Sequence, residues 1–180
     1  MANNNFNTLK TCTLKDVRVL TRGNWRNFGG HDDGMYNREG DRNFTISLDK
    51  DIAEQMIADG WDIRVREPKS EEYDTEYTLK IRIKYRNHDG EPMPAGLSPV
   101  VYFVTDGQRR VVDEDEVGAL DQASISKANL VIRQYPWTYG KKTGVGTSLA
   151  IGYFYLEMTD FDDPFADEFL EDIELPFDAE

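Results

Sequence analysis

Residues 77–86 read YTLKIRIKYR and show the clearest alternation of apolar and charged side chains in the sequence. Leu79, Ile81, Ile83 and Tyr85 fall on one face, and every residue between them is lysine or arginine. Because successive side chains of a β-strand point to opposite faces of a sheet, this pattern predicts a strand with one buried face. The opposite, cationic face consists of Lys80, Arg82, Lys84 and Arg86.

Strand patterns on either side of this segment predict a mainly β fold. We expect further strands at 15–21, 43–48, 61–66, 99–105, 129–137 and 147–158. The first core-facing residue of the 61–66 strand is Trp61, and the apolar run PVVYFVT at 99–105 predicts a strand buried on both faces. Two short helices are expected, one from an Asp49 N-cap to Gly60 and one within 113–123. These helices are too short to support a parallel sheet, so we predict an antiparallel barrel or sandwich with long loops at 22–41 and 139–146.

The acidic residues of the chain are concentrated near its C-terminal end. Eleven of the 34 lie in 157–180, and no lysine or arginine follows Lys142. Residues 1–156 hold the other 23 acidic residues and all 21 basic ones, so the formal charge of −13 divides into −2 and −11. We therefore expect a polar N-terminal arm at 1–14, one domain at 15–157 and a flexible acidic tail at 158–180. A nearly neutral domain leaves nucleic acid open as a partner, which the overall charge alone would disfavour.

The sequence offers little support for catalysis or for a metal site. His31 and His88 each precede an acidic residue in a loop, and neither spacing provides three or four converging ligands. Cys12 has no recognisable base partner beside it. We therefore expect no catalytic residue, no metal and no cofactor. One cysteine, the absence of a signal-peptide pattern and the absence of a long apolar run predict a soluble cytoplasmic protein, in the host cytoplasm if it is viral.

Three segments combine cationic and aromatic side chains, namely 22–42, the cationic face of 80–86 with Arg64, and 135–142. Single-stranded nucleic acid requires this combination, because cations follow the phosphates and aromatic rings stack on unpaired bases. The predicted stacking residues are Trp25, Phe28, Tyr36, Tyr135, Trp137 and Tyr139. The predicted phosphate contacts are Arg22, Arg26, Arg38, Arg42, Arg64, Arg82, Lys84, Arg86, Lys141 and Lys142.

Each segment also has a simpler interpretation. Trp25 and Phe28 could fold back as a cap on one end of a barrel, and the aromatic residues of 135–139 could belong to the core. The cationic strand face could be a solvated edge that lysine and arginine protect from aggregation. A second functional hypothesis is an acidic protein-interaction module, either a virion component or a DNA mimic.

Several motifs within 15–157 resemble the single-stranded DNA-binding proteins of tailed bacteriophages. They are Asn27–Gly30 (NFGG), Met35–Phe44 (MYNREGDRNF), Leu48–Asp49, Ala58–Asp62 (ADGWD), Val112–Asp115 (VDED), Leu120–Asp121 and Val131–Trp137 (VIRQYPW). The resemblance implies an oligonucleotide-binding barrel (OB-fold) and DNA binding without enzymatic activity. It also implies a role in phage DNA replication or recombination.

The end of the chain is similar to the acidic C-terminal tail of bacterial single-stranded DNA-binding proteins. The matching stretch is Glu171–Phe177 (EDIELPF), after which Asp178, Ala179 and Glu180 follow here. We expect the tail either to compete with DNA for the protein's own cationic groove or to recruit replication or recombination proteins; a purely solubilising tail is the alternative. The residues expected to bind such partners are Phe161, Phe165, Phe169, Ile173, Leu175, Pro176 and Phe177. The oligomeric state is open, with a homodimer as one alternative.

Overall fold

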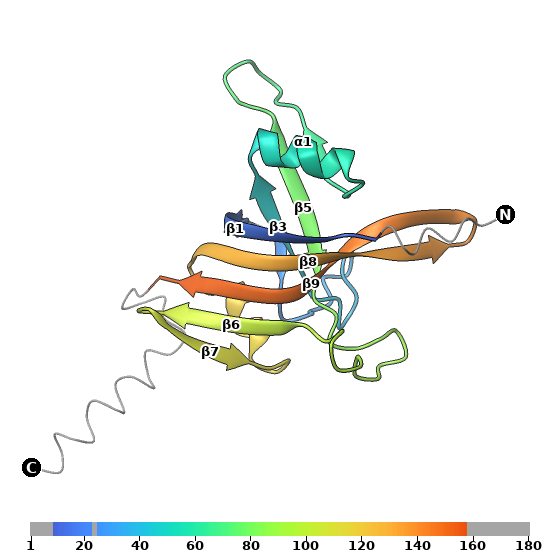
Figure 1. Ribbon diagram of the computed structural model, residues 1–180, viewed down its shortest axis with the longest axis vertical. Coiled ribbons are helices and arrows are strands. Elements are labelled where there is room, and N and C mark those ends of the chain that lie inside the picture. Colours follow the sequence, from blue (N-terminus) through green and yellow to red (C-terminus); the bar gives the residue numbers. More distant parts are fainter. Residues whose placement is uncertain (1–8, 23–24, 158–180) are drawn as a thin grey trace, which may run out of the picture.

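The computed structural model describes residues 9–22 and 25–157, and strands dominate them (Figure 1). The elements are β1 (Thr11–Val19), β2 (Arg26–Asn27), β3 (Asn43–Leu48), α1 (Lys50–Ala58), β4 (Arg64–Arg66), β5 (Glu76–Arg82), β6 (Val100–Thr105), β7 (Gln108–Val112), the 3₁₀-helix η3 (Val117–Asp121), β8 (Ile125–Tyr139) and β9 (Lys142–Leu156). The predicted acidic tail and its partner-binding residues lie outside the described residues. Within these residues, no helix has the length and apolar character needed to cross a membrane.

Five strands are hydrogen-bonded into a closed ring in the order β1–β3–β5–β9–β8 and back to β1. Neighbouring strands in the ring run antiparallel except β5 and β9, which pair in parallel at Arg82 and Ser148. Strand β6 joins the other edge of β9, also in parallel, and β7 follows as its hairpin partner. The predicted mainly β barrel is confirmed. Its sheet is mixed rather than wholly antiparallel. The parallel pairs β5–β9 and β6–β9 are possible because a long stretch of chain connects the two strands of each pair.

The alternation predicted for 77–86 is present in the structure. Leu79, Ile81 and Ile83 are buried, while Lys80 and Arg82 on the opposite face are partly exposed. Strand β5 ends at Arg82, earlier than predicted, and the Ile83 N–H donates a 2.9 Å hydrogen bond to the Arg42 carbonyl in the preceding loop. The apolar face of β5 therefore enters the core, and its cationic face lies on the outside of the ring.

An aromatic cluster occupies the centre of the core. The ring of Phe28 stacks on that of Phe44, with centroids 5.0 Å apart, and both rings meet the edge of Phe154 at 5.4 Å. Phe28 is 0% exposed, so its predicted role in base stacking is wrong. The short strand β2 pairs with β3 just before Phe28 and brings this side chain against Phe44. Trp61 is buried in the same core, as predicted.

Strands β8 and β9 form one long hairpin that extends past the other strands, to the right in Figure 1. The predicted loop at 139–146 is wrong, because cross-strand pairing continues to Tyr139 and Lys142. Only Gly140 and Lys141 form the turn, and Gly140 adopts a φ of +60°, which glycine allows without strain. The 135–139 segment is therefore held on a strand rather than in an irregular loop.

The other elements differ from expectation mainly in extent. Helix α1 follows Asp49 and is succeeded by Gly60 at φ +87°, as predicted, whereas the second expected helix is a 3₁₀-helix. Strand β6 buries Val101 and Phe103 on one face and only Val104 on the other, where Val100 is exposed, so the prediction that both faces are buried is correct only in part. Strand β4 is shorter than the predicted 61–66 strand, and its Val65 is exposed.

Candidate nucleic-acid interface

Two neighbouring hollows on the protein surface share Arg82 and Lys84. The first, called the hairpin hollow, has a volume of about 440 Å³ and lies between β4, β5 and the β8–β9 hairpin. Its main lining residues are Arg64, Lys80, Arg82, Lys84, Tyr135 and Trp137. The second, called the loop hollow, has a volume of about 710 Å³. Its lining residues include five cations, three carboxylates and two larger side chains, namely Arg38, Arg42, Arg82, Lys84 and Arg86, then Glu39, Asp41 and Glu114, and then Tyr85 and Met93.

The hairpin hollow gathers four cations, three from the adjacent strands β4 and β5 and the fourth, Lys84, from just after β5. Burial, and then the charge of Arg82, lower the pKa of Lys84 to about 8. The pKa of Lys80 is also lowered, by burial first and then by Arg82 and Arg64. Among the described lining residues only Asp62 is acidic. These cations are partly desolvated and repel one another. An anionic ligand such as a phosphate would offset both the cost of desolvation and the repulsion between the cations.

The aromatic residues of the hairpin lie flat against glycines on the opposite strand. Tyr135 pairs with Gly146, and Trp137 pairs with Gly144. A Cβ atom at Gly144 would approach Trp137 Cζ2 to 2.3 Å, and one at Gly146 would approach Tyr135 Cζ to 2.3 Å. Each ring therefore covers glycine backbone. Trp137 remains 41% exposed, so its ring can still receive a base.

Tyr135 is engaged with a lysine of the same hollow. The Lys84 ammonium lies 3.2 Å from the centre of the Tyr135 ring, a cation–π contact. With Gly146 against the ring as well, Tyr135 has less free surface for a base than Trp137. The arrangement instead holds the Lys84 ammonium in place at the junction of the two hollows.

The cations of the loop hollow differ in how far contacts within the protein already occupy them. The Arg42 guanidinium donates through Nη1 to the Phe28 carbonyl at 2.7 Å and faces the Tyr85 ring. Arg86 is ion-paired with Glu114, with 2.8 Å between Nε and Oε1. The Tyr85 hydroxyl is buried without a hydrogen-bond partner among the described residues. The loop hollow therefore combines five cations with three carboxylates, one of which, Glu114, is paired with Arg86.

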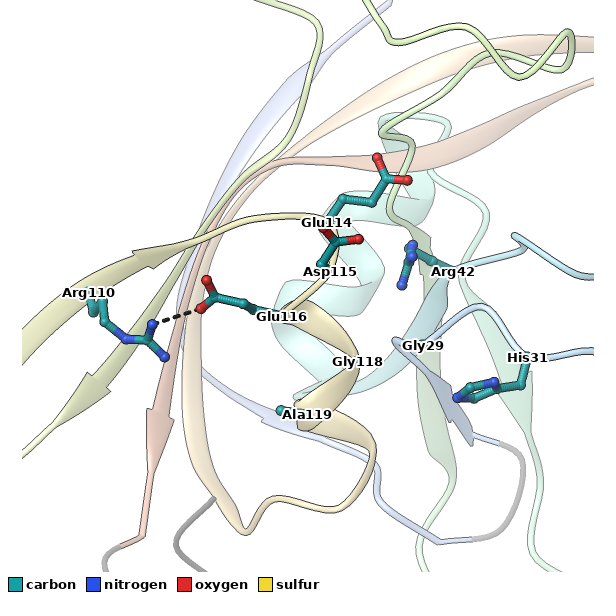
Figure 2. A pocket seen from close by; sticks show the side chains of 9 residues that line it. All are labelled: Gly29, His31, Arg42, Arg110, Glu114, Asp115, Glu116, Gly118 and Ala119. Carbon is teal, nitrogen blue, oxygen red and sulfur yellow. Dashed lines mark hydrogen bonds and ion pairs between the residues drawn. The ribbon is translucent and has the colours of Figure 1, made fainter. Parts of the chain in front are cut away.

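A third hollow, of about 560 Å³, lies beyond Arg42 and has a different character (Figure 2). Glu114, Asp115 and Glu116 lie on one side of it, and His31 and Arg42 lie on the other. Arg110 forms a 2.7 Å ion pair with Glu116. This hollow has three carboxylates against two arginines, whereas the loop hollow has five cations against three carboxylates, so the excess of positive charge ends here. In the described part of the chain, no group of three or more His, Cys, Asp or Glu side chains could hold a metal ion.

Several residues predicted to contact DNA lie away from these hollows or are used inside the protein. Arg26 donates through Nη1 to the carbonyls of Leu120 and Ala123 at 2.9 and 2.8 Å, and burial lowers its pKa. These bonds tie β2 to the end of η3, so Nη1 of Arg26 is already engaged inside the protein. Outside the two hollows lie half-buried Trp25, exposed Arg22 before β2, and exposed Tyr139, Lys141 and Lys142 at the hairpin tip.

Sequence reasoning misses the glycines beneath the aromatic rings. The usable signal is that aromatic residues recur at every second position of 135–139, and glycines do so at Gly144 and Gly146. This signal becomes informative only once the two segments are known to pair across a two-residue turn. Tyr85 and Met93 are also missed as lining residues, because both depend on how the 83–99 connection folds.

A closed β ring whose outer face combines cations with an accessible aromatic ring is the arrangement of a protein that binds single-stranded nucleic acid. The chain belongs to a phage single-stranded DNA-binding family, because the family model described as "Putative phage ssDNA-binding domain" matches residues 1–178. Among curated proteins, none matches the sequence.

Solved structures similar to this chain include the single-stranded DNA-binding protein of bacteriophage Enc34. Its complex with single-stranded DNA has a TM-score of 0.53 at 11% identity, over 84% of this chain and 89% of that one. A C-terminally truncated form of the same protein has a TM-score of 0.53 at 12% identity, over 83% and 87% of the two chains. At such identities the likeness concerns the fold, and it supports the barrel described above.

Proposed function

We propose that this protein binds single-stranded DNA, regardless of base sequence, along a track formed by the hairpin hollow and the loop hollow. It serves phage DNA replication or recombination by covering single strands, and it acts by binding rather than by catalysis. The observation that carries this proposal is the position of Arg82 and Lys84, which line both hollows and join them into one cationic surface.

Each part of the track matches one part of a single strand. Arg64, Lys80 and Arg82 on one side of the hairpin hollow provide charge for phosphates, while Trp137 on the other side provides a ring for a base. Every base has a π-face, so stacking tolerates any sequence, and phosphate contacts carry no sequence information. Family membership supports DNA as the ligand.

Replacing Arg82 should reduce both the affinity for single-stranded DNA and its salt dependence. We expect Arg82→Gln to lower the slope of log affinity against log salt by about 0.7, the value for one phosphate contact on a single strand. The measurement is a fluorescence anisotropy titration of labelled oligo(dT) at a series of salt concentrations.

The matched control for this titration is Lys69→Gln. It also removes one positive charge, but from the exposed 67–75 loop at the top of Figure 1, outside both hollows. Its slope should equal that of the unmodified protein. Equal slopes for all three proteins, or no binding at low salt, would show that the track is not the DNA site.

We further propose that the acidic residues after Glu157 regulate access to this track and recruit replication or recombination proteins. The basis is charge complementarity, because the net −11 of residues 157–180 accompanies a domain whose two hollows are cationic. Phenylalanines between the acidic residues supply rings in the places where a single strand has bases. The segment would thus compete with weakly bound nucleic acid.

Removing residues 158–180 should raise the affinity for oligo(dT), by roughly tenfold at low salt and by less at high salt, because screening weakens the competing charge. The same anisotropy titration measures this effect. A truncated chain that folds but binds DNA no better than the full chain would exclude competition. Loss of DNA binding on truncation would instead place the binding function in the removed segment.

A further inference from the structure

The 31–42 loop, between β2 and β3, carries two large and mostly exposed side chains at its tip. Met35 is 80% exposed and Tyr36 is 71% exposed. Exposed apolar residues are common singly, but here two are adjacent on one tip, and neither contributes to the core. The tip therefore has no role in stabilising the domain through packing.

The tip is nevertheless held in a defined shape. One oxygen of Asp33, Oδ1, accepts hydrogen bonds from the backbone N–H groups of Met35, Tyr36 and Asn37 at 2.9, 2.7 and 2.9 Å. The other oxygen, Oδ2, accepts from the Asn37 side chain at 2.8 Å. These bonds, led by that from Asn37, lower the pKa of Asp33 to about 2, so the carboxylate keeps them at any physiological pH.

Buried asparagines anchor the base of the loop to the barrel. Asn43 on β3 donates to the side chain of Asn37 at 2.8 Å, and both are buried. Asn27 on β2 donates to the carbonyls of His31 and Asp41 at 2.9 and 3.1 Å, closing the two ends of the loop together. Polar contacts at the base of the loop thus fix its shape. They also hold the backbone of Met35 and Tyr36 in place.

The loop stands beside the DNA track. Arg38 and Arg42, which follow the tip, line the loop hollow. Burial lowers the pKa of Lys80 in the hairpin hollow, and the charges of Asp41 and Asp33 oppose this shift, so the loop is within electrostatic range of that hollow too. A single strand lying in the track would therefore pass close to the Met35–Tyr36 tip.

Proteins that bend duplex DNA insert exposed apolar side chains as wedges between neighbouring bases and unstack them. Two side chains are too small a surface for a stable protein partner, which needs a patch of several hundred Å². A rigid loop is well suited to act as a wedge. Its conformational entropy is lost when the protein folds, so little further entropy is lost when it contacts DNA. The ligand that fits both the exposed apolar tip and its rigid loop is a set of unpaired or unstacking bases next to the cationic track.

We propose that the Met35–Tyr36 tip is a preformed wedge that enters the base stack where a single strand meets a duplex and holds the terminal bases apart. This inference rests on the proposed function, because the track must bind the released strand. The track alone would open hairpins only by trapping strands that separate spontaneously, and the wedge adds a faster opening of short hairpins.

The test compares the opening of a DNA hairpin that carries an oligo(dT) extension with simple binding to oligo(dT). Fluorophore and quencher at the two stem ends report opening by stopped flow. The double variant Met35→Ala with Tyr36→Ala should slow opening by roughly tenfold or more, since unstacking costs a few kcal/mol per base step. Its affinity for oligo(dT) should change by less than about fivefold, the effect of losing at most a weak stacking contact.

Two further variants separate the wedge from general effects. Tyr73→Ala removes a tyrosine of similar exposure, 70%, from the distant 67–75 loop and should leave both measurements unchanged. Asp33→Ala keeps the two tip residues but removes their frame, so it should also slow opening.

Equal losses of opening rate and oligo(dT) affinity in the double variant would overturn the wedge, because the tip would then be an ordinary part of the track. Unchanged opening in the double variant would overturn it as well. If the unmodified protein binds oligo(dT) but opens no hairpin, the wedge fails while the proposed function stands. If it binds no oligo(dT), the proposed function itself fails.

Discussion

Trp137→Ala is expected to weaken binding to single-stranded DNA by about 1–3 kcal/mol, roughly 5- to 150-fold, the range measured for loss of one base-stacking ring. The Trp137 ring borders the hairpin hollow, rests on the backbone of Gly144 and keeps 41% of its surface exposed. An oligo(dT) titration by anisotropy measures the loss. The salt slope should stay unchanged, because no phosphate contact is removed.

Gly144→Ala tests the same ring without removing it. A Cβ atom at this position would come within 2.3 Å of the indole, so the ring must tilt away, and part of the affinity should be lost. Tyr73→Ala, on the 67–75 loop, is the control for loss of an exposed aromatic side chain. If Trp137→Ala and Tyr73→Ala bind oligo(dT) equally well, the hairpin is not a stacking platform.

Phe28→Ala is expected to lower the free energy of unfolding by about 3–5 kcal/mol, the usual cost of truncating a buried phenylalanine to alanine. The side chain is 0% exposed and contacts Phe44 and Phe154. Urea denaturation measures the loss. Below the unfolding transition the variant should bind oligo(dT) with nearly unchanged affinity, because the ring is not available to a base.

Tyr36→Ala provides the comparison for Phe28→Ala. Its side chain is 71% exposed, so the free energy of unfolding should change by no more than about 0.5 kcal/mol. A stable Phe28→Ala variant with weakened DNA binding would contradict the placement of Phe28 in the core and restore its predicted role in stacking.

Local patterns in the sequence are sufficient to predict the elements whose burial is periodic. The alternation around Leu79 and Ile81 identifies both the buried and the cationic face of β5, and Asp49 and Gly60 bracket helix α1 correctly. These features depend on residues near in sequence. The cationic strand face of the candidate site follows from the same pattern, because a strand that buries one face must present the other.

The roles of single aromatic and basic residues were less predictable, because they depend on contacts that are distant in sequence. Phe28 and Arg26 occupy a polar, glycine-rich segment that predicts an exposed loop. Pairing of β2 with β3 turns Phe28 into the core, and carbonyls more than ninety residues away engage Arg26. The two strands of the β8–β9 hairpin are predicted, but their extension through 139–146 is not, because the glycines there are typical of a loop and instead support aromatic rings from the opposite strand.

The way the ring closes links DNA binding to folding. Strands β5 and β9 complete the ring through one register pair, Arg82 with Ser148, and Arg82 also lines both halves of the track. A ligand that binds only the folded chain raises its free energy of unfolding, by about 2.7 kcal/mol when its free concentration is a hundred times its dissociation constant. DNA lying across this seam would therefore reinforce the narrowest closure of the barrel. Protein and nucleic acid would protect each other, the strand from nucleases and the barrel from opening.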